Sequence, residues 1–184
     1  MKKIKLVIIF VVLGFISCNK IDDNGFRIYK IKEGKHRSTF KIKYTRENSF
    51  DIQVKFNESA IYTSQSPENQ LDVNKLWGVS DCGTHHSKNS IRFGWRWDLN
   101  HKQIEILIYR RLSGEFSFKS LGYVNPGDIS YMSLNITNDH YYMSLNGIED
   151  SMSRNCYNPC RRYFLYPYFG GNEKAPHDIT IKIK

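Results

Sequence analysis

The sequence predicts an all-β protein, built as a two-sheet antiparallel jelly-roll sandwich of about ten strands. Short segments that alternate apolar and polar residues recur along the chain with turn signals between them, which is the pattern of a sandwich or barrel. Aromatic residues make up 14% of the chain, and such side chains suit a half-buried pleated surface. After residue 20 no run of Ala, Leu, Glu and Lys appears at helical spacing, which leaves strands as the building elements.

The first half of the domain contributes four predicted strands, at residues 26–31, 39–44, 50–56 and 59–64. Segment 50–56, "FDIQVKF", is the clearest, because its apolar residues all fall on one face. Residues 65–90 are long, polar and irregular, apart from a short strand around Leu76. A long loop in a compact domain is usually functional or disordered, and the Trp, the Cys and the two adjacent His residues favour function.

The second half contributes the remaining strands. The segments "IRFGWRW" (91–97), "QIEILIY" (103–109) and "GEFSFKSLGYV" (114–124) alternate, and the turn "NPGD" closes the last of them. The near-duplicates "YMSLN" at 131–135 and 142–146 predict two arms of a hairpin, and the "NG" that ends the second copy is a strong turn signal. "RRYFLYPYFGG" (161–171) and the terminal "ITIKIK" (179–184) follow. Short connections between these segments predict antiparallel pairing.

The alternation in segment 91–97 also predicts which of its side chains point into the core. Its aromatic rings at 93, 95 and 97 alternate with Arg92 and Arg96. We predict that the rings point into the core, because burying two arginines there would cost more free energy. Both arginines then lie on an exposed face beside Glu105 and Tyr109. Two cations and a ring on one surface would form a cradle for an acidic sugar.

A basic head and an apolar run open the chain. Residues 1–17, "MKKIKLVIIFVVLGFIS", have the pattern of a secretory signal, and the apolar run is shorter than the roughly 20 residues that a membrane-spanning helix needs. Cys18 follows Ser17 at the end of this run, which resembles the lipobox of bacterial lipoproteins, with Phe15 and Ile16 departing from the usual residues. The alternative is an ordinary signal peptide that ends beside an incidental cysteine.

The residues after Cys18, "NKIDDN", resemble the tag that carries lipoproteins of Bacteroidota to the outer face of the outer membrane. The resemblance implies a cleaved signal peptide at 1–17, a lipidated linker at 18–25 and a single β-sandwich domain at 26–184. It also implies that a lipid anchor makes the membrane a partner and places the protein in the outer membrane, at the cell surface.

The net charge of the chain indicates which classes of partner it favours. Residues 1–17 hold three of the 27 Lys and Arg residues, so their removal leaves 24 against 18 Asp and Glu, a formal charge of about +6. This surplus favours acidic partners such as uronic or sulfated glycans, whereas the scattered basic residues argue against nucleic acid. No cofactor or metal is predicted, because adjacent His85 and His86 rarely both reach one ion and no dense acidic loop is present for calcium.

The order of segments between residues 92 and 147, "RFGWRW", "IEILIY", "LGYVNPGDISYMSLNI" and "YYMSLNG", resembles the central strands of concanavalin A-like (lectin/glucanase and laminin-G) β-sandwiches. "NKLWGVSDCGTHHSKNSIRFGWRW" and "YPYFGGNEKAPHDITI" resemble segments of uncharacterised Bacteroidota lipoproteins. The resemblance implies fold and location only. The E-x-D-x-x-E strand of the glucanase branch is absent, which argues against a retaining glycosidase with two nearby carboxylates.

Two polar loops hold the strongest candidate functional residues. His85, His86 and Asn89 lie in the loop before residue 91, and His177 lies in the loop before the last strand. The leading expectation is a cell-surface lipoprotein that binds glycans, with an acidic polysaccharide as partner. The ligand-binding residues expected for it are Arg92, Arg96, Tyr109, His85, His86 and Asn89.

The enzyme alternative is a polysaccharide lyase that acts on a uronate-containing glycan. His85 or His177 would be its base, Tyr109 its acid, and Arg92 would neutralise the uronate carboxylate. This alternative requires the two histidine loops to meet at one end of the sheet. A third alternative is a structural or adhesion module without a small ligand, in which these residues only stiffen their loops.

Three cysteines follow Cys18 in the sequence: Cys82, Cys156 and Cys160. An oxidising compartment favours a disulfide, and the odd number leaves one of the three thiols free or paired elsewhere. Cys156 and Cys160 flank the turn "YNP", so a bond across that turn is feasible. A bond from Cys82 to either of them would close a far longer loop, and the sequence leaves this choice open.

Overall fold

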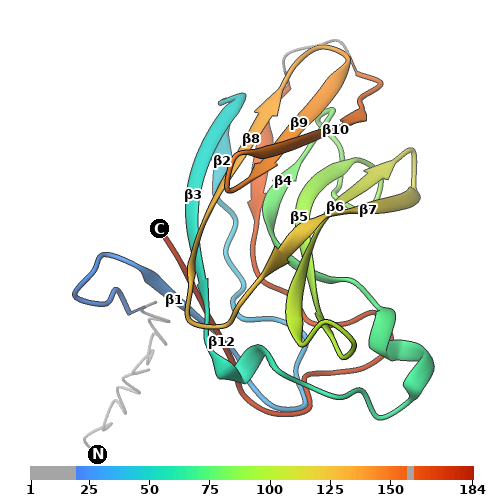
Figure 1. Cartoon of the computed structure of the whole chain (residues 1–184). Coiled ribbons are helices and arrows are strands. Elements are labelled where there is room, and N and C mark those ends of the chain that lie inside the picture. The colour runs from blue at the N-terminus through green and yellow to red at the C-terminus, as the bar shows by residue number, and fades with distance from the viewer. Residues whose placement is uncertain (1–19, 157–159) are drawn as a thin grey trace, which may run out of the picture.

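The computed structural model describes residues 20–156 and 160–184, which form two six-stranded sheets packed face to face (Figure 1). Two short 3-10 helices, η1 (Glu58–Ala60) and η2 (Pro67–Leu71), follow the third strand, and no helix in these two ranges is long and apolar enough to cross a membrane. The strands are β1 (Arg27–Ile31), β2 (Tyr44–Thr45), β3 (Ser49–Phe56), β4 (Asn74–Ser80), β5 (Ser90–Asp98), β6 (Gln103–Leu112), β7 (Glu115–Val124), β8 (Ile129–Ile136), β9 (His140–Leu145), β10 (Ile148–Ser153), β11 (Arg162–Leu165) and β12 (Ile179–Ile183).

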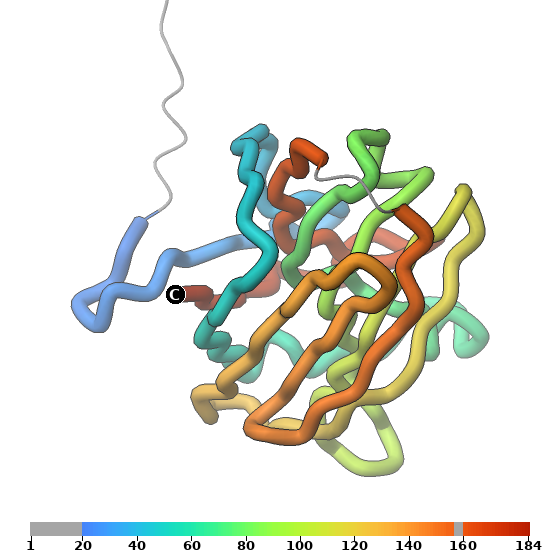
Figure 2. Tube along the Cα trace, turned by 90° about the horizontal axis from the view of Figure 1, so that it is seen from above, coloured from blue at the N-terminus to red at the C-terminus, as the bar shows by residue number. Residues whose placement is uncertain are grey.

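The order of strands is that of an antiparallel sandwich. The first sheet has the order β1-β12-β3-β8-β9-β10, and the second has the order β2-β11-β4-β5-β6-β7. All pairings between these strands are antiparallel. The first and last strands lie side by side, so the two ends of the described chain come together in one sheet (Figure 2). The predicted jelly-roll sandwich is confirmed, with twelve strands in the described ranges where about ten were expected.

The core lies between the sheets, and β5 has the predicted orientation. Phe93, Trp95 and Trp97 point toward the first sheet and are buried. The Phe56 ring, from β3 in the first sheet, lies 5.4 Å from the Trp95 ring. Each fully buried side chain of this size contributes roughly 1.5–3 kcal/mol of hydrophobic free energy. Because side chains alternate along a strand, the residues between these rings lie on the opposite side of the second sheet, which we call its outer face.

The predicted strand at 39–44 is wrong for most of its length. Only its last residue belongs to a strand, the two-residue β2. The Ser38 N–H donates to Pro167 O, and Lys43 O accepts from Phe164, so the segment is bonded to the β11 region at both ends. Phe40, midway between these bonds, is exposed. Alternation yields a strand only where the backbone has a partner, and here the middle of the segment lies apart from β11.

Two other predictions on this side of the chain also differ from the structure. The segment predicted as a strand at 59–64 starts inside η1, because the Asn57 side chain accepts from the Ser59 N–H and caps a turn. β4 is longer than expected: it spans seven residues and includes the short strand predicted around Leu76. A bulge between Lys75 and Trp77 breaks its period of two, so the sequence pattern does not show the full length of the strand. Cys18 and the predicted signal peptide lie outside the described residues.

Candidate ligand-binding site

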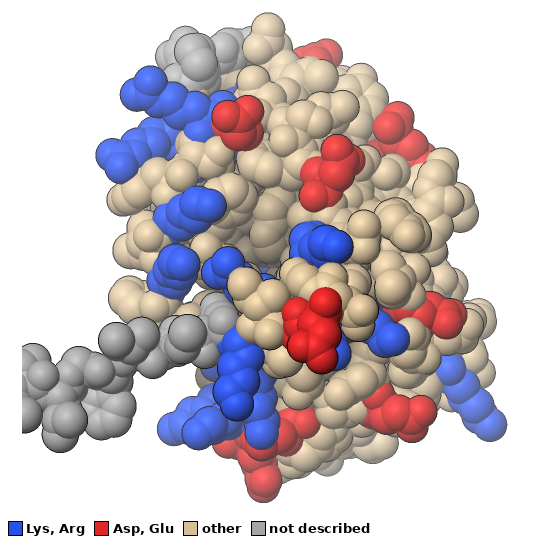
Figure 3. All heavy atoms as spheres, turned by 90° about the vertical axis from the view of Figure 1, so that its left-hand side faces the viewer, with Lys and Arg blue, Asp and Glu red and all other residues tan. Residues whose placement is uncertain are grey.

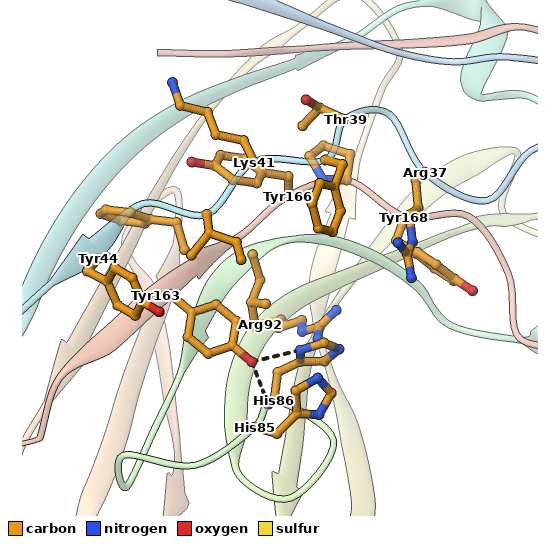
Figure 4. A pocket seen from close by; sticks show the side chains of 15 residues that line it. Arg37, Thr39, Lys41, Tyr44, His85, His86, Arg92, Tyr163, Tyr166 and Tyr168 are labelled. Atoms are coloured by element: carbon orange, nitrogen blue, oxygen red, sulfur yellow. Dashed lines mark hydrogen bonds between the residues drawn. The ribbon is translucent and has the colours of Figure 1, made fainter.

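A cavity of about 490 Å³ opens beside β11, a volume typical of ligand pockets (Figure 4). Segment 37–44 lies on one side of it and residues 163–168 on another. The loop between β4 and β5 contributes His85 and His86, and β5 contributes Arg92. The cavity therefore brings together three of the residues that the sequence singled out, His85, His86 and Arg92, with strand β11, which begins some 70 residues after Arg92.

Arg92 is the most unusual residue of this cavity. Its side chain leaves β5 on the outer face, yet the residue is only 8% exposed. Its Nε is buried without a hydrogen-bond partner among the described residues, and no carboxylate there forms an ion pair with it. Burial lowers the pKa of Arg92 to about 10, so the guanidinium remains charged at neutral pH. A buried cation without an acidic partner is costly, and an anionic ligand would relieve that cost.

Lys75, on β4, adds a second positive charge nearby. Its Nζ donates to Gly170 O at 3.1 Å and lies 5.1 Å from the centre of the Tyr109 ring. Burial, together with repulsion from Arg92, lowers the pKa of Lys75 to about 8. Two neighbouring cations that repel each other make this part of the outer face electropositive.

His86 and Tyr163 form a hydrogen-bonded pair at the cavity (Figure 4). The Tyr163 hydroxyl accepts from the His86 backbone N–H at 2.8 Å and lies 2.9 Å from Nδ1 of the same residue. Burial, with the nearby charge of Arg92, lowers the pKa of His86 to about 4. The imidazole is therefore neutral at pH 7, and its Nδ1 can accept the hydroxyl proton of Tyr163. The two contacts fix the Tyr163 hydroxyl at the cavity.

The other residues of this loop have different surroundings. His85 is exposed, its Nδ1 lies 2.7 Å from Ser87 Oγ, and its ring lies 4.1 Å from the ring of His86. Asn89 is buried and does not line the cavity. Its side chain donates to Thr84 Oγ1 and accepts from the Ser113 N–H. In this structure Asn89 holds the loop in shape, and His85 and His86 reach the cavity.

The predicted exposed cradle is wrong, although its members do share the outer face. Arg96 donates to Glu105 at 2.6 Å and to the Leu71 carbonyl, so its guanidinium is already engaged. Tyr109 is only 5% exposed, because Lys75 lies over its ring. Side chains from neighbouring strands thus bury residues that the alternation of a single strand predicts to be exposed.

His177 does not join the site. Its Nε2 lies 2.9 Å from the Ser59 carbonyl, next to η1. The loop that carries it is bonded to the beginning of β4 through Lys75 and Gly170, whereas His85 follows the end of β4. The two histidine loops therefore lie at opposite ends of β4. The lyase predicted from the sequence, with His85 or His177 as its base, required these loops to meet, and the structure does not bring them together.

Of the three cysteines whose pairing the sequence left open, Cys82 and Cys156 form a disulfide and Cys160 is a free thiol. Cys160 lies beside the same buried group as the disulfide, the carboxylate of Asp81, to which it donates at 3.0 Å. Burial and this hydrogen bond raise the pKa of the Cys160 thiol. The disulfide fixes the start of the histidine loop to the chain that leads into β11.

Comparison with solved structures supports this fold. The alginate lyase AlyC3 superposes with a TM-score of 0.61 at 11% identity, over 89% of this chain and 75% of that one. The alginate lyase A1-II', a member of polysaccharide lyase family-7, gives a TM-score of 0.57 at 12% identity, over 93% and 82% of the two chains. A GH16 protein from the Bacteroides ovatus mixed linkage glucan PUL gives 0.56 at 12% identity, over 89% and 81%.

No protein-family model matches the chain, and no curated protein matches its sequence. The likeness at these low identities lies in the fold. The chain is thus a jelly-roll sandwich similar in architecture to the alginate lyases and the GH16 glucanases.

Proposed function

We propose that the protein binds an acidic polysaccharide, with a uronate carboxylate seated on Arg92. The observation that carries this proposal is the buried guanidinium of Arg92, which has an unpaired Nε and no acidic partner among the described residues. Arginine presents a planar set of donors that matches a carboxylate, and Lys75 supplies a second positive charge. Similar folds that act on or bind polysaccharides, among them an alginate lyase in complex with dimannuronate, support the choice of ligand.

The remaining lining of the cavity suits a sugar. Several rings and apolar side chains border it, and these can contact the C–H faces of a pyranose while the polar groups hold its carboxylate and hydroxyls. The positive charge of the chain also favours a polyanion over a neutral glucan. Glu105, the acidic residue of β6 on this face, is engaged by Arg96 at 2.6 Å, which does not fit the two free carboxylates that glycoside hydrolysis uses.

Binding can be tested with the soluble domain against alginate, pectin and glycosaminoglycans in polysaccharide-containing native gels. We expect retardation by at least one polyuronate, and Arg92→Ala should abolish it. Arg27→Ala, on β1 in the other sheet, is the matched control and should bind like the wild type. Equal retardation of the Arg92→Ala variant and the wild type would refute the role of Arg92. No retardation by any glycan would favour a structural or adhesion module.

A second candidate function, a polysaccharide lyase, is favoured by the His86–Tyr163 pair. In β-elimination a base removes the proton next to the carboxylate, a C=C bond forms, and the glycosidic C–O bond breaks as its oxygen takes up a proton. Tyr163, whose hydroxyl oxygen is held by the His86 backbone N–H, would in its tyrosinate form remove the substrate proton and afterwards return that proton to the leaving oxygen. Arg92 would stabilise the charge that develops on the carboxylate. Tyr163 takes the role that the sequence suggested for Tyr109.

Ultraviolet absorbance of unsaturated sugar ends distinguishes the two candidates. If the protein is a lyase, absorbance should rise with a polyuronate, and Tyr163→Phe should lower the rate by at least about a hundredfold. Tyr131→Phe, on the first sheet and away from the cavity, is the control. Retardation in the gel without any rise in absorbance would leave binding as the function.

We also propose that the mature protein is anchored through a lipid on Cys18 at the outer face of the outer membrane. The motif around this residue supports that location. Cys18→Ala should then release the protein from the membrane fraction of the producing cells. Retention of the variant in that fraction would contradict the anchor without bearing on the glycan site.

A further inference from the structure

Two large apolar side chains on β7 are exposed on the outer face of the second sheet. Phe116 is 58% exposed and Phe118 is 42% exposed. Their rings are nearly parallel, with centroids 6.4 Å apart and an interplanar angle of 5°. The Phe116 ring is also within 11° of parallel to Tyr109, on the neighbouring strand β6. We call the exposed pair of Phe116 and Phe118 the ring platform.

The register of the sheet connects the ring platform to the Arg92 site. Arg92 pairs with Tyr109 across β5 and β6, and Tyr109 pairs with Phe118 across β6 and β7. Directly paired residues point to the same face of a sheet. Adjacent strands lie about 4.8 Å apart, so Phe118 stands about 10 Å from Arg92 in a row perpendicular to the strands. The platform is therefore a continuation of the same surface.

The exposure of the platform has no structural explanation in the sandwich. β7 is an edge strand of its sheet, and apolar side chains on an exposed edge favour unwanted association. The core already contains the inward-facing residues of β7, Leu121 and Val124, and neither ring of the platform belongs to it. A ligand that covers the two rings would remove this exposed apolar area.

We propose that the ring platform is a second sugar subsite, which binds the C–H face of a pyranose in the same polysaccharide chain whose carboxylate is seated on Arg92. This inference rests on the proposed function and deepens it, because it makes the ligand an oligomer that crosses the strands from β5 to β7. The guanidinium of Arg111 lies 5.6 Å from the centre of the Phe116 ring. It places a positive charge beside the platform, which suits a chain that carries further carboxylates.

Calorimetric titration with polyuronate oligosaccharides of increasing length tests this subsite. The wild type should bind longer oligomers more tightly than the shortest oligomer that it binds at all. The double variant Phe116→Ala/Phe118→Ala should bind that shortest oligomer like the wild type and lose the gain with length, by about tenfold or more. Tyr131→Ala removes a ring that is 60% exposed on the first sheet and serves as the matched control. Thermal melting of each variant confirms that it is folded.

The outcomes separate this inference from the function on which it rests. A length-dependent affinity that survives in the double variant would overturn the ring platform and leave the Arg92 site intact. Loss of binding to every length in Arg92→Ala, with a length-specific loss in the double variant, would support both. Absence of binding by the wild type at every length would refute the proposed function, and the platform inference with it.

Discussion

At the scale of single residues, the carboxylate of Asp81 organises the base of the candidate site. It is fully buried and accepts hydrogen bonds from Arg154 at 2.6 Å, from Arg162 at 2.9 Å and from Tyr141 at 2.7 Å. Tyr141 belongs to the first sheet and Arg162 to the second. Asp81 thus ties the two sheets together at the point where the histidine loop begins.

Asp81→Asn should destabilise the protein by about 3–5 kcal/mol, because two arginines would be left buried without their counter-charge. Urea unfolding at pH 7 measures this, with the exposed Asp51→Asn as the control. Burial acts to raise the pKa of Asp81, but the hydrogen bonds from Arg154 and Tyr141 hold it well below its usual range. The stabilisation should therefore be complete above about pH 5 and decline as the pH falls. Overlapping unfolding curves for wild type and variant would contradict this role.

At the scale of elements, the loop between β4 and β5 is held by contacts at both ends. The disulfide from Cys82 to Cys156 fixes its start, and Asn89 bonds to Ser113 beyond β6. Between these points the Tyr163 hydroxyl fixes His86. The imidazole that faces the cavity is therefore placed by three separate parts of the chain.

Removal of the disulfide in Cys82→Ser/Cys156→Ser should lower the free energy of unfolding by about 4 kcal/mol, as expected for a long closed loop. The bond spans 74 residues of sequence. Glycan retardation should weaken in the same variant even where it is folded, because the histidine loop loses its anchor. Cys160→Ser, which keeps a donor for Asp81, is the control for urea unfolding and gel retardation. If the double variant were as stable as this control, the disulfide would not be what holds the loop.

The elements that could be predicted from the sequence are those that pair along their whole length. β5, β6 and the hairpin of β8 and β9 alternate clearly, and the inward orientation of Trp95 followed from the cost of burying Arg92 and Arg96. Only a short strand around Leu76 could be predicted for β4, because its bulge interrupts the alternation. Lys75, on the same strand, was not singled out.

The candidate site was only partly predictable for a related reason. His85, His86 and Arg92 could be singled out because they are close in sequence. Two adjacent histidines lie in a long loop, and an arginine follows in an aromatic-rich strand. Tyr163 joins them only because β11 lies next to β4 in the sheet, an arrangement that the local pattern of "RRYFLY" does not contain. The burial of Arg92 and Tyr109 likewise depends on neighbouring strands and segments rather than on their own.

At the scale of the whole molecule, basic side chains are unevenly distributed. In Figure 3 a group of Lys and Arg side chains lies along the left margin of the face turned to the viewer, and others lie nearer its centre and right side among scattered Asp and Glu. The candidate cavity itself is lined by three basic residues, Arg37, Lys41 and Arg92. A field of one sign around a cleft raises the local concentration of a ligand of the opposite sign. Association with a polyuronate should therefore weaken as the salt concentration rises.

The positive charge of Lys75 makes the affinity for an anionic ligand depend on pH. Burial and the nearby Arg92 lower its pKa to about 8, while Asp72 partly offsets them and Arg111 adds to them. As the pH rises from 7 to 9 the free protein loses this positive charge, whereas the ligand carboxylates stay ionised, so affinity should fall over that range. An arginine remains charged there, and Lys75→Arg should remove the decline.

Calorimetric titrations at several pH values measure this effect, with Lys55→Arg on β3 as the matched control. The lowered pKa of Lys75 also changes how the free energy of unfolding depends on pH. The unfolded chain holds the Lys75 proton up to its ordinary pKa of about 10.5, so between pH 8 and that value the unfolded state binds more protons than the folded state. The contribution of Lys75 to stability should accordingly rise with pH in this window while affinity falls. A Lys75→Arg variant whose affinity declined with pH as steeply as the wild type would assign the decline to another group, because an arginine at this position cannot lose its proton there.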